Sequence, residues 1–191
     1  MRTIRRSGPY LRVADPDWDD PLDGRHAAES GGRWNPPESF PVVYLCRSIP
    51  VARANVYRKL EGQPYGPEDL RPGRGPILVR TRIPEDGYLN VITDAGCRDA
   101  GLPRTYPLDS RRRMVSWRRC QPIGLRAWGA GLPGVAARSA AVDPRMLRSG
   151  SRAATRSMQA EELAYFGPRR LRRGAVRAFD EWFWEAPSAG H

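Results

Sequence analysis

The segment 30–45, SGGRWNPPESFPVVYL, holds an arginine between a pair of glycines and a pair of prolines. A planar guanidinium donates two parallel hydrogen bonds, which suits it to a pyrophosphate better than the ammonium of lysine. Gly31 and Gly32 let a ligand approach the backbone, and the prolines and the strand after them would fix Arg33 in place. The alternative is that Arg33 pairs with an acidic neighbour such as Asp23 and closes a loop. The residue taken alone favours that alternative.

Histidine and cysteine usage excludes several kinds of site. The chain has only two histidines, so a site built from several of them is excluded, and a Ser-His-Asp relay could use only His26. Its three cysteines are odd in number and widely separated, which predicts neither a disulfide framework nor a zinc site. We therefore expect no metal.

The net charge of +11 comes almost wholly from arginine, with Lys59 the sole lysine. Nucleic-acid surfaces usually mix both residue types, because phosphate neutralisation needs charge more than geometry. Arginine in place of lysine, with abundant Ala, Gly and Pro, is typical of a GC-rich genome. A nucleic-acid-binding protein built on the clusters at 111–113, 117–119 and 169–173 is thus a lesser alternative. A basic surface would still attract an acidic partner or an anionic ligand.

Composition and periodicity predict one α+β domain. No apolar run approaches the ~20 residues of a membrane span, and no apolar region follows the basic N-terminus, so we expect a soluble cytoplasmic chain. Residues 1–29 are expected to be irregular. Strands are expected at 42–46, 77–83, 87–92, 124–128 and 134–141, helices at 51–62 and 109–120, and a short helix or edge strand at 160–166.

Several blocks in order resemble the RES domain family. Gly31–Pro37 comes first, then Pro41–Leu45 and an Ala-x-Ala helix start, and then the segments LPGVAARSAA at 132–141 and EELAYF at 161–166. The resemblance implies a fold similar to ADP-ribosyltransferases, with a mixed sheet and short helices. We expect an N-terminal extension at 1–21, the RES domain at 22–166 and a basic and aromatic C-terminal extension at 167–191. In that extension, packing of residues 182–184 on the domain is favoured over docking of a partner.

The resemblance also implies an activity. RES proteins are toxins of bacterial toxin–antitoxin pairs that bind NAD+ and break its nicotinamide–ribose bond, by phosphorolysis in some members and with ADP-ribosyl transfer in others. This implies no prosthetic group, NAD+ as the substrate and inorganic phosphate as a co-substrate. The implied partner is a Xre-type helix-turn-helix antitoxin whose C-terminal part plugs the site. A homo-oligomer within that complex is compatible with the resemblance.

The family's site positions carry over by motif. Arg33 and Arg138 would hold phosphates, and Ser139 would orient the ribose. Trp34 and Tyr44 offer flat faces for nicotinamide or adenine, although as bare residues both are more often core. The catalytic set implied is Arg33, Asn55 and Ser139, and the NAD-binding set is Arg33, Trp34, Tyr44 and Arg138.

One position departs from the family: Asn55 stands where a glutamate is expected. A carboxylate stabilises the oxocarbenium ion formed when the glycosidic bond breaks, and losing such a group commonly slows a reaction by ~10²–10³-fold. Glu61 lies on another face of the helix. The remaining acids that could reach inward, without a motif behind them, are Glu29, Glu38, Glu161 and Glu162. The rival reading is a non-catalytic protein that binds NAD+ or ADP-ribose.

Overall fold

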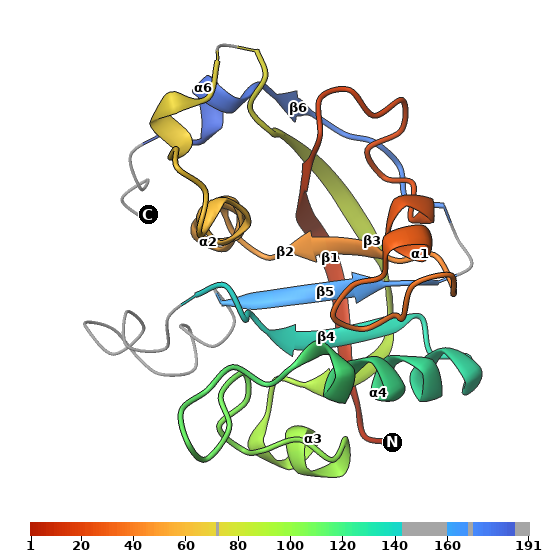
Figure 1. The fold of residues 1–191 in the computed structure, drawn as a ribbon. Helices are drawn as coiled ribbons and strands as arrows, with labels where there is room; N and C mark the ends of the chain where they lie inside the picture. The colour runs from red at the N-terminus through yellow and green to blue at the C-terminus, as the bar shows by residue number, and fades with distance from the viewer. Residues whose placement is uncertain (72, 143–159, 168–169, 186–191) are drawn as a thin grey trace, which may run out of the picture.

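A six-stranded sheet forms the centre of the computed structural model, which describes residues 1–71, 73–142, 160–167 and 170–185 (Figure 1). The strand order is β1-β2-β5-β4-β3-β6. The strands are β1 (Thr3–Ala14), β2 (Val43–Cys46), β3 (Ile77–Val91), β4 (Gly134–Arg138), β5 (Glu161–Tyr165) and β6 (Val176–Arg177). β3 and β4 run parallel and the other neighbours antiparallel, so the sheet is mixed, as the α+β expectation required.

β1 and β3 also pair with each other along most of their lengths, which closes the ring β1-β2-β5-β4-β3. The expectation that residues 1–29 are irregular is therefore wrong for β1. Its Gly8-Pro9 dipeptide, which is typical of a loop, lies beside a register shift, where a strand ladder tolerates both residues. The expected strands 77–83 and 87–92 are likewise one continuous strand, β3.

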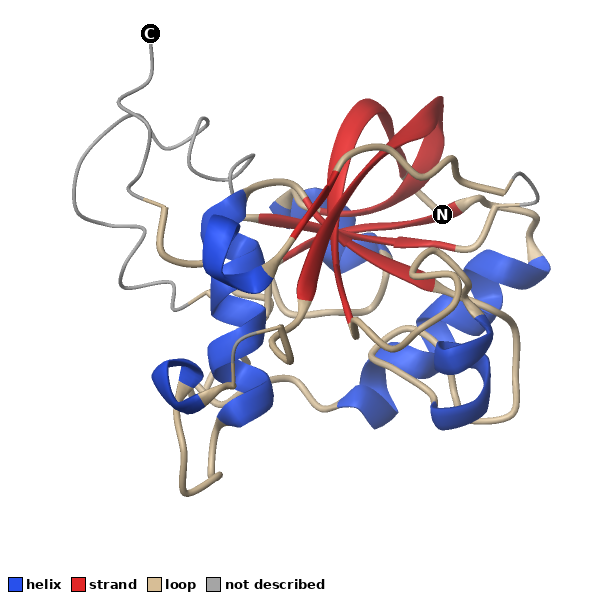
Figure 2. Ribbon diagram, turned by 90° about the horizontal axis from the view of Figure 1, so that it is seen from above, coloured by secondary structure: helices blue, strands red, loops and turns tan. Residues whose placement is uncertain are grey.

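The helices cover different parts of the sheet (Figure 1, Figure 2). α2 packs on β1 and β2, α3 on β3, and α4 on β4. No helix in the described ranges is both long and apolar enough to cross a membrane. The helices are α1 (Arg25–Ser30), α2 (Ile49–Leu60), the 3-10 turn η1 (Pro67–Asp69), α3 (Asp94–Asp99), α4 (Trp117–Gly129) and α6 (Phe179–Trp182).

α4 corrects two expectations. The helix expected at 109–120 and the strand expected at 124–128 are both wrong, because α4 begins at Trp117 and runs to Gly129 through Pro122. Its buried residues recur at helical spacing and face the larger core cluster, and this packing outweighs the short run of small residues that suggested a strand. They are Cys120, Ile123, Gly124 and Ala127.

The C-terminal part of the chain returns to the domain. Residues 161–165 form β5, which lies between β2 and β4 in the middle of the sheet. Trp182 and Phe183 are buried against α2, so packing on the domain is confirmed for these two, while Trp184 is exposed. Arg169 of the basic cluster and residues 186–191 of the extension lie outside the described residues.

Candidate functional site

The loop between α1 and β2, residues 31–42, is held by buried polar groups. Asn35 is fully buried: its Nδ2 donates to a carbonyl of α1, and its Oδ1 accepts from the Tyr44 hydroxyl at 2.8 Å. The same hydroxyl oxygen accepts from the backbone N–H of Trp34 at 2.9 Å. The residues on both sides of Arg33 are thereby tied to β2 and α1, as a preorganised binding residue requires.

Arg33 is buried, with 8% of its surface exposed. Its Nη1 donates to the carbonyl oxygen of Val115 at 2.9 Å. The alternative pairing with Asp23 is not found, because Asp23 pairs with Arg25 at 2.6 Å. Among the described residues Arg33 forms no ion pair, so its charge is available to an anion in the cavity that it lines.

Glu162 on β5 is the carboxylate at which the predicted residues meet. Asn55 Nδ2, from α2, donates to Glu162 Oε1 at 2.8 Å, and Ser139 Oγ, just after β4, donates to the same oxygen at 2.9 Å. Ser139 is itself fixed by the backbone N–H of Ala141, which donates to its Oγ at 3.1 Å. Ser139 does not line the cavity, but it is joined to the cavity through Glu162.

The neighbouring Glu161 faces away from this point, because adjacent residues of a strand lie on opposite faces of the sheet. It is 1% exposed and accepts hydrogen bonds from Arg6 Nε at 2.9 Å and from the Tyr10 hydroxyl at 2.5 Å. Of the acids that the sequence left open, only Glu162 lines the cavity, whereas Glu29 and Glu38 are exposed.

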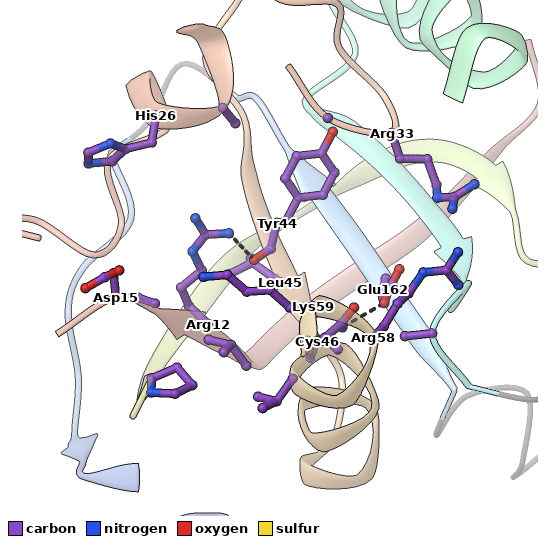
Figure 3. A pocket seen from close by; sticks show the side chains of 18 of the residues that line it. Arg12, Asp15, His26, Arg33, Tyr44, Leu45, Cys46, Arg58, Lys59 and Glu162 are labelled. Atoms are coloured by element: carbon purple, nitrogen blue, oxygen red, sulfur yellow. Dashed lines mark hydrogen bonds between the residues drawn. The ribbon is translucent and has the colours of Figure 1, made fainter. Parts of the chain in front are cut away.

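Arg58 is a cavity residue that the sequence reasoning missed. It lies three residues after Asn55 on α2, so both side chains occupy one side of the helix. It donates to the carbonyl of Ala140. Figure 3 shows Arg58 and Arg33 pointing toward one another beside Glu162. Two guanidinium groups and one carboxylate therefore line the same part of the cavity in this view.

Arg12 on β1 was also missed. It is buried and donates from Nη1 to the carbonyl of Tyr44 at 2.9 Å (Figure 3). Its guanidinium carbon lies 5.4 Å from the centroid of the Trp18 ring. Its Nε has no hydrogen-bond partner among the residues that the structure describes. Burial lowers the pKa of Arg12 to about 10, which leaves it charged at neutral pH. The sequence pattern could not identify Arg12, because residues 1–29 were expected to be irregular and no strand was predicted there.

One cavity of about 640 Å³ joins these residues (Figure 3). Ligand sites usually measure roughly 300–1,000 Å³. His26 lies away from Glu162 in Figure 3, and its ring stacks on that of Trp18 with ring centroids 4.2 Å apart. Cations outnumber carboxylates in the lining, which suits an anionic ligand of nucleotide size. They are Arg12, Arg33, Arg58, Lys59 and Arg74, against Asp15 and Glu162.

Neither Trp34 nor Arg138 has a hydrogen bond or ion pair to Glu162 in the described part of the chain. Trp34 is one of the residues that line the cavity, but only 2% of it is exposed, and its ring packs in the core against Tyr106 with centroids 6.0 Å apart. Arg138 does not line the cavity: it pairs with Asp94 at 2.6 Å and donates to three backbone carbonyls. This geometry favours packing for Trp34 and a structural role for Arg138. Tyr44, half-buried, does line the cavity.

The described part of the chain brings no three His, Cys, Asp or Glu side chains into a group that could hold a metal ion.

A family model described as "RES domain" matches residues 9–165, a match that begins within β1. Proteins named NAD(+) phosphorylase MbcT, from Mycobacterium bovis and Mycobacterium tuberculosis, are 29% identical over 118 residues, or 61% of this chain. The match spans 59% of those relatives' length. The crystal structure of the M. tuberculosis MbcT–MbcA toxin–antitoxin complex shares the fold, with a TM-score of 0.70 and 22% identity over 95% of this chain and 91% of that chain.

Proposed function

This chain belongs to the RES domain family, and from that premise we propose that it binds NAD+ and cleaves the bond between nicotinamide and ribose. One observation carries the proposal: Arg33, Tyr44 and Asn55 line a single cationic cavity. Glu162 lines the same cavity and accepts a hydrogen bond from Ser139, which connects Ser139 to the site. The relatives named NAD+ phosphorylases support it.

The cationic side chains that line the cavity would bind the pyrophosphate of NAD+. NAD+ carries one negative charge on each phosphate, and guanidinium groups recognise phosphate oxygens through charge-assisted hydrogen bonds. Arg33 and Arg58 stand near Glu162, and Arg12 offers an unpartnered Nε from β1. The Tyr44 ring offers an aromatic face to nicotinamide or adenine.

The reaction follows from the chemistry of the bond. When the bond between ribose C1′ and the nicotinamide nitrogen breaks, its electron pair leaves with nicotinamide, whose ring becomes neutral. The ribose gains oxocarbenium character, which a nearby negative charge stabilises. Phosphate then adds at C1′ in phosphorolysis, water adds in hydrolysis, and a protein side chain adds in ADP-ribosyl transfer. Asn55 and Ser139 act at the ribose end of the site.

The biological role proposed is that of a toxin which depletes cytoplasmic NAD+ and is controlled by a Xre-type antitoxin covering the cavity. A similarly folded chain is known from a toxin–antitoxin complex, which supports this assignment. The antitoxin is expected to prevent NAD+ from entering.

Proton NMR of NAD+ incubated with the purified protein tests the proposal, with and without inorganic phosphate, and an Arg33→Ala variant prepared in the same way controls for contaminating enzymes. Phosphate-dependent release of nicotinamide supports phosphorolysis, and phosphate-independent release supports hydrolysis or transfer. Binding by calorimetry without release supports a binding protein. If the protein neither releases nicotinamide nor binds NAD+, the proposal is overturned.

A further inference from the structure

Glu162 lies within hydrogen-bond distance of Asn55, the position at which the resemblance leads us to expect a glutamate. We propose that Glu162, on β5, supplies the negative charge that Asn55 lacks, and this inference rests on the proposed cleavage of NAD+. Glu162 acts as the catalytic carboxylate, while Asn55 and Ser139 are positioning residues that act through it.

The two hydrogen bonds fix the orientation of this carboxylate. Asn55 Nδ2 and Ser139 Oγ both donate to Oε1, at 2.8 Å and 2.9 Å. No described residue donates to Oε2. Because Glu162 lines the cavity, Oε2 is the oxygen that remains for a substrate. A carboxylate held by its other oxygen meets the requirement for a preorganised charge.

The same contact explains why an amide, and not a second acid, stands at position 55. A carboxylate there would lie about 3 Å from Glu162, and two carboxylates that close do not both stay ionised. An amide donates where an acid would repel. Asn55 is therefore complementary to Glu162, and the departure from the family moves the negative charge from α2 to β5.

The surroundings allow a carboxylate and an anionic substrate to share the cavity. Arg33 and Arg58 line the same cavity as Glu162 and point toward one another beside it in Figure 3, so their positive charges offset the repulsion between the carboxylate and the pyrophosphate. As nicotinamide leaves with the electron pair of the broken bond, Glu162 faces the positive charge that forms on the ribose. Nicotinamide leaves as a neutral molecule, so its departure requires no proton from Glu162.

The first test is Glu162→Gln, which keeps the shape and an oxygen acceptor but removes the charge. We expect kcat for nicotinamide release to fall by about 10²–10³-fold, with the Kd for NAD+ changed less than threefold. The matched control is Glu61→Gln, an exposed acid just beyond α2, which should leave the rate unchanged. Thermal unfolding of both variants shows whether they fold.

The second test exchanges the two side chains. The double variant Asn55→Glu/Glu162→Asn places a carboxylate back on α2 next to an amide on β5, and it should recover at least tenfold over Glu162→Gln. Asn55→Ala frees the carboxylate and should lower kcat without weakening NAD+ binding.

The outcomes separate this inference from the proposed function. If the native protein releases nicotinamide and Glu162→Gln does so at the same rate, the inference is overturned and the function stands. If the native protein binds NAD+ without releasing nicotinamide, Glu162 has no catalytic role and the inference is overturned. The assignment of the cavity as an NAD+-binding site would still hold. If it does neither, both are overturned.

Discussion

The ring of Tyr44 packs directly on Gly32: a Cβ at residue 32 would meet the Tyr44 hydroxyl oxygen at 2.4 Å. The first glycine of the pair is packed as closely, on Pro37, and adopts φ +75°. From the sequence we expected this pair to let a ligand approach the backbone. In the structure both glycines line the cavity and also allow close packing within the protein, and the contact between Gly32 and Tyr44 holds the Arg33 loop against β2.

Gly32→Ala should therefore disturb the site through packing. The added methyl group forces Tyr44 or the loop to shift, which should lower the free energy of unfolding by about 1–3 kcal/mol and weaken NAD+ binding at least tenfold. Urea denaturation and calorimetry measure the two effects. Gly129→Ala is the control, because a Cβ there meets nothing within 4 Å. A Gly32→Ala protein with native stability and affinity would contradict the role of this contact.

Arg12→Met should separate binding from stability. Losing a charge-assisted hydrogen bond to phosphate, worth about 1.5–3 kcal/mol, should raise the Kd for NAD+ about 10–100-fold. The unliganded protein should unfold at the same or a higher temperature, because a buried guanidinium with an unpartnered Nε is unfavourable. Calorimetry and thermal unfolding check both, with the exposed Arg82→Met as control. Unchanged NAD+ affinity would remove Arg12 from the site.

Arg138→Ala should affect the fold and leave NAD+ binding intact. Its guanidinium bonds to three backbone carbonyls and to Asp94, so removal should lower the free energy of unfolding by about 2–4 kcal/mol. The hydrogen bond from Arg138 lowers the pKa of Asp94, so that part of the stability is present at neutral pH and is lost as the pH falls. The exposed Arg98→Ala is the control. A large loss of NAD+ affinity would instead support the phosphate role expected from the family.

The raised pKa of the Cys46 thiol predicts that the protein loses stability at alkaline pH. Burial, reinforced by Glu162, raises the pKa of this thiol from 9.0 to about 12. Between these values the unfolded chain releases the proton and the folded chain keeps it, so stability falls with rising pH by about 1.4 kcal/mol per unit for this group. Urea denaturation from pH 8 to 11 should show a shallower decline in Cys46→Ala than in the native protein. Parallel declines would contradict the assignment.

Local sequence patterns were sufficient for the elements around the site. The strand at 43–46 and the helix at 49–60 follow from apolar content and from the prolines and glycines at their ends. The motif positions Arg33, Tyr44 and Asn55 do line one cavity. β1 and α4 were missed, because β1 exists through its pairing with the distant β3 and α4 through its packing in the core, and short-range spacing reports neither contact.

The sequence by itself determined which residue types the site contains, including an amide where the family has a glutamate. Only the tertiary structure decided which acid accompanies it. Asn55 and Glu162 are 107 residues apart in the chain and meet because α2 packs beside a sheet in which β5 pairs with β2. The register of β5 then selects Glu162 over Glu161, since alternate residues of a strand point to opposite faces and a slip of one residue would exchange them.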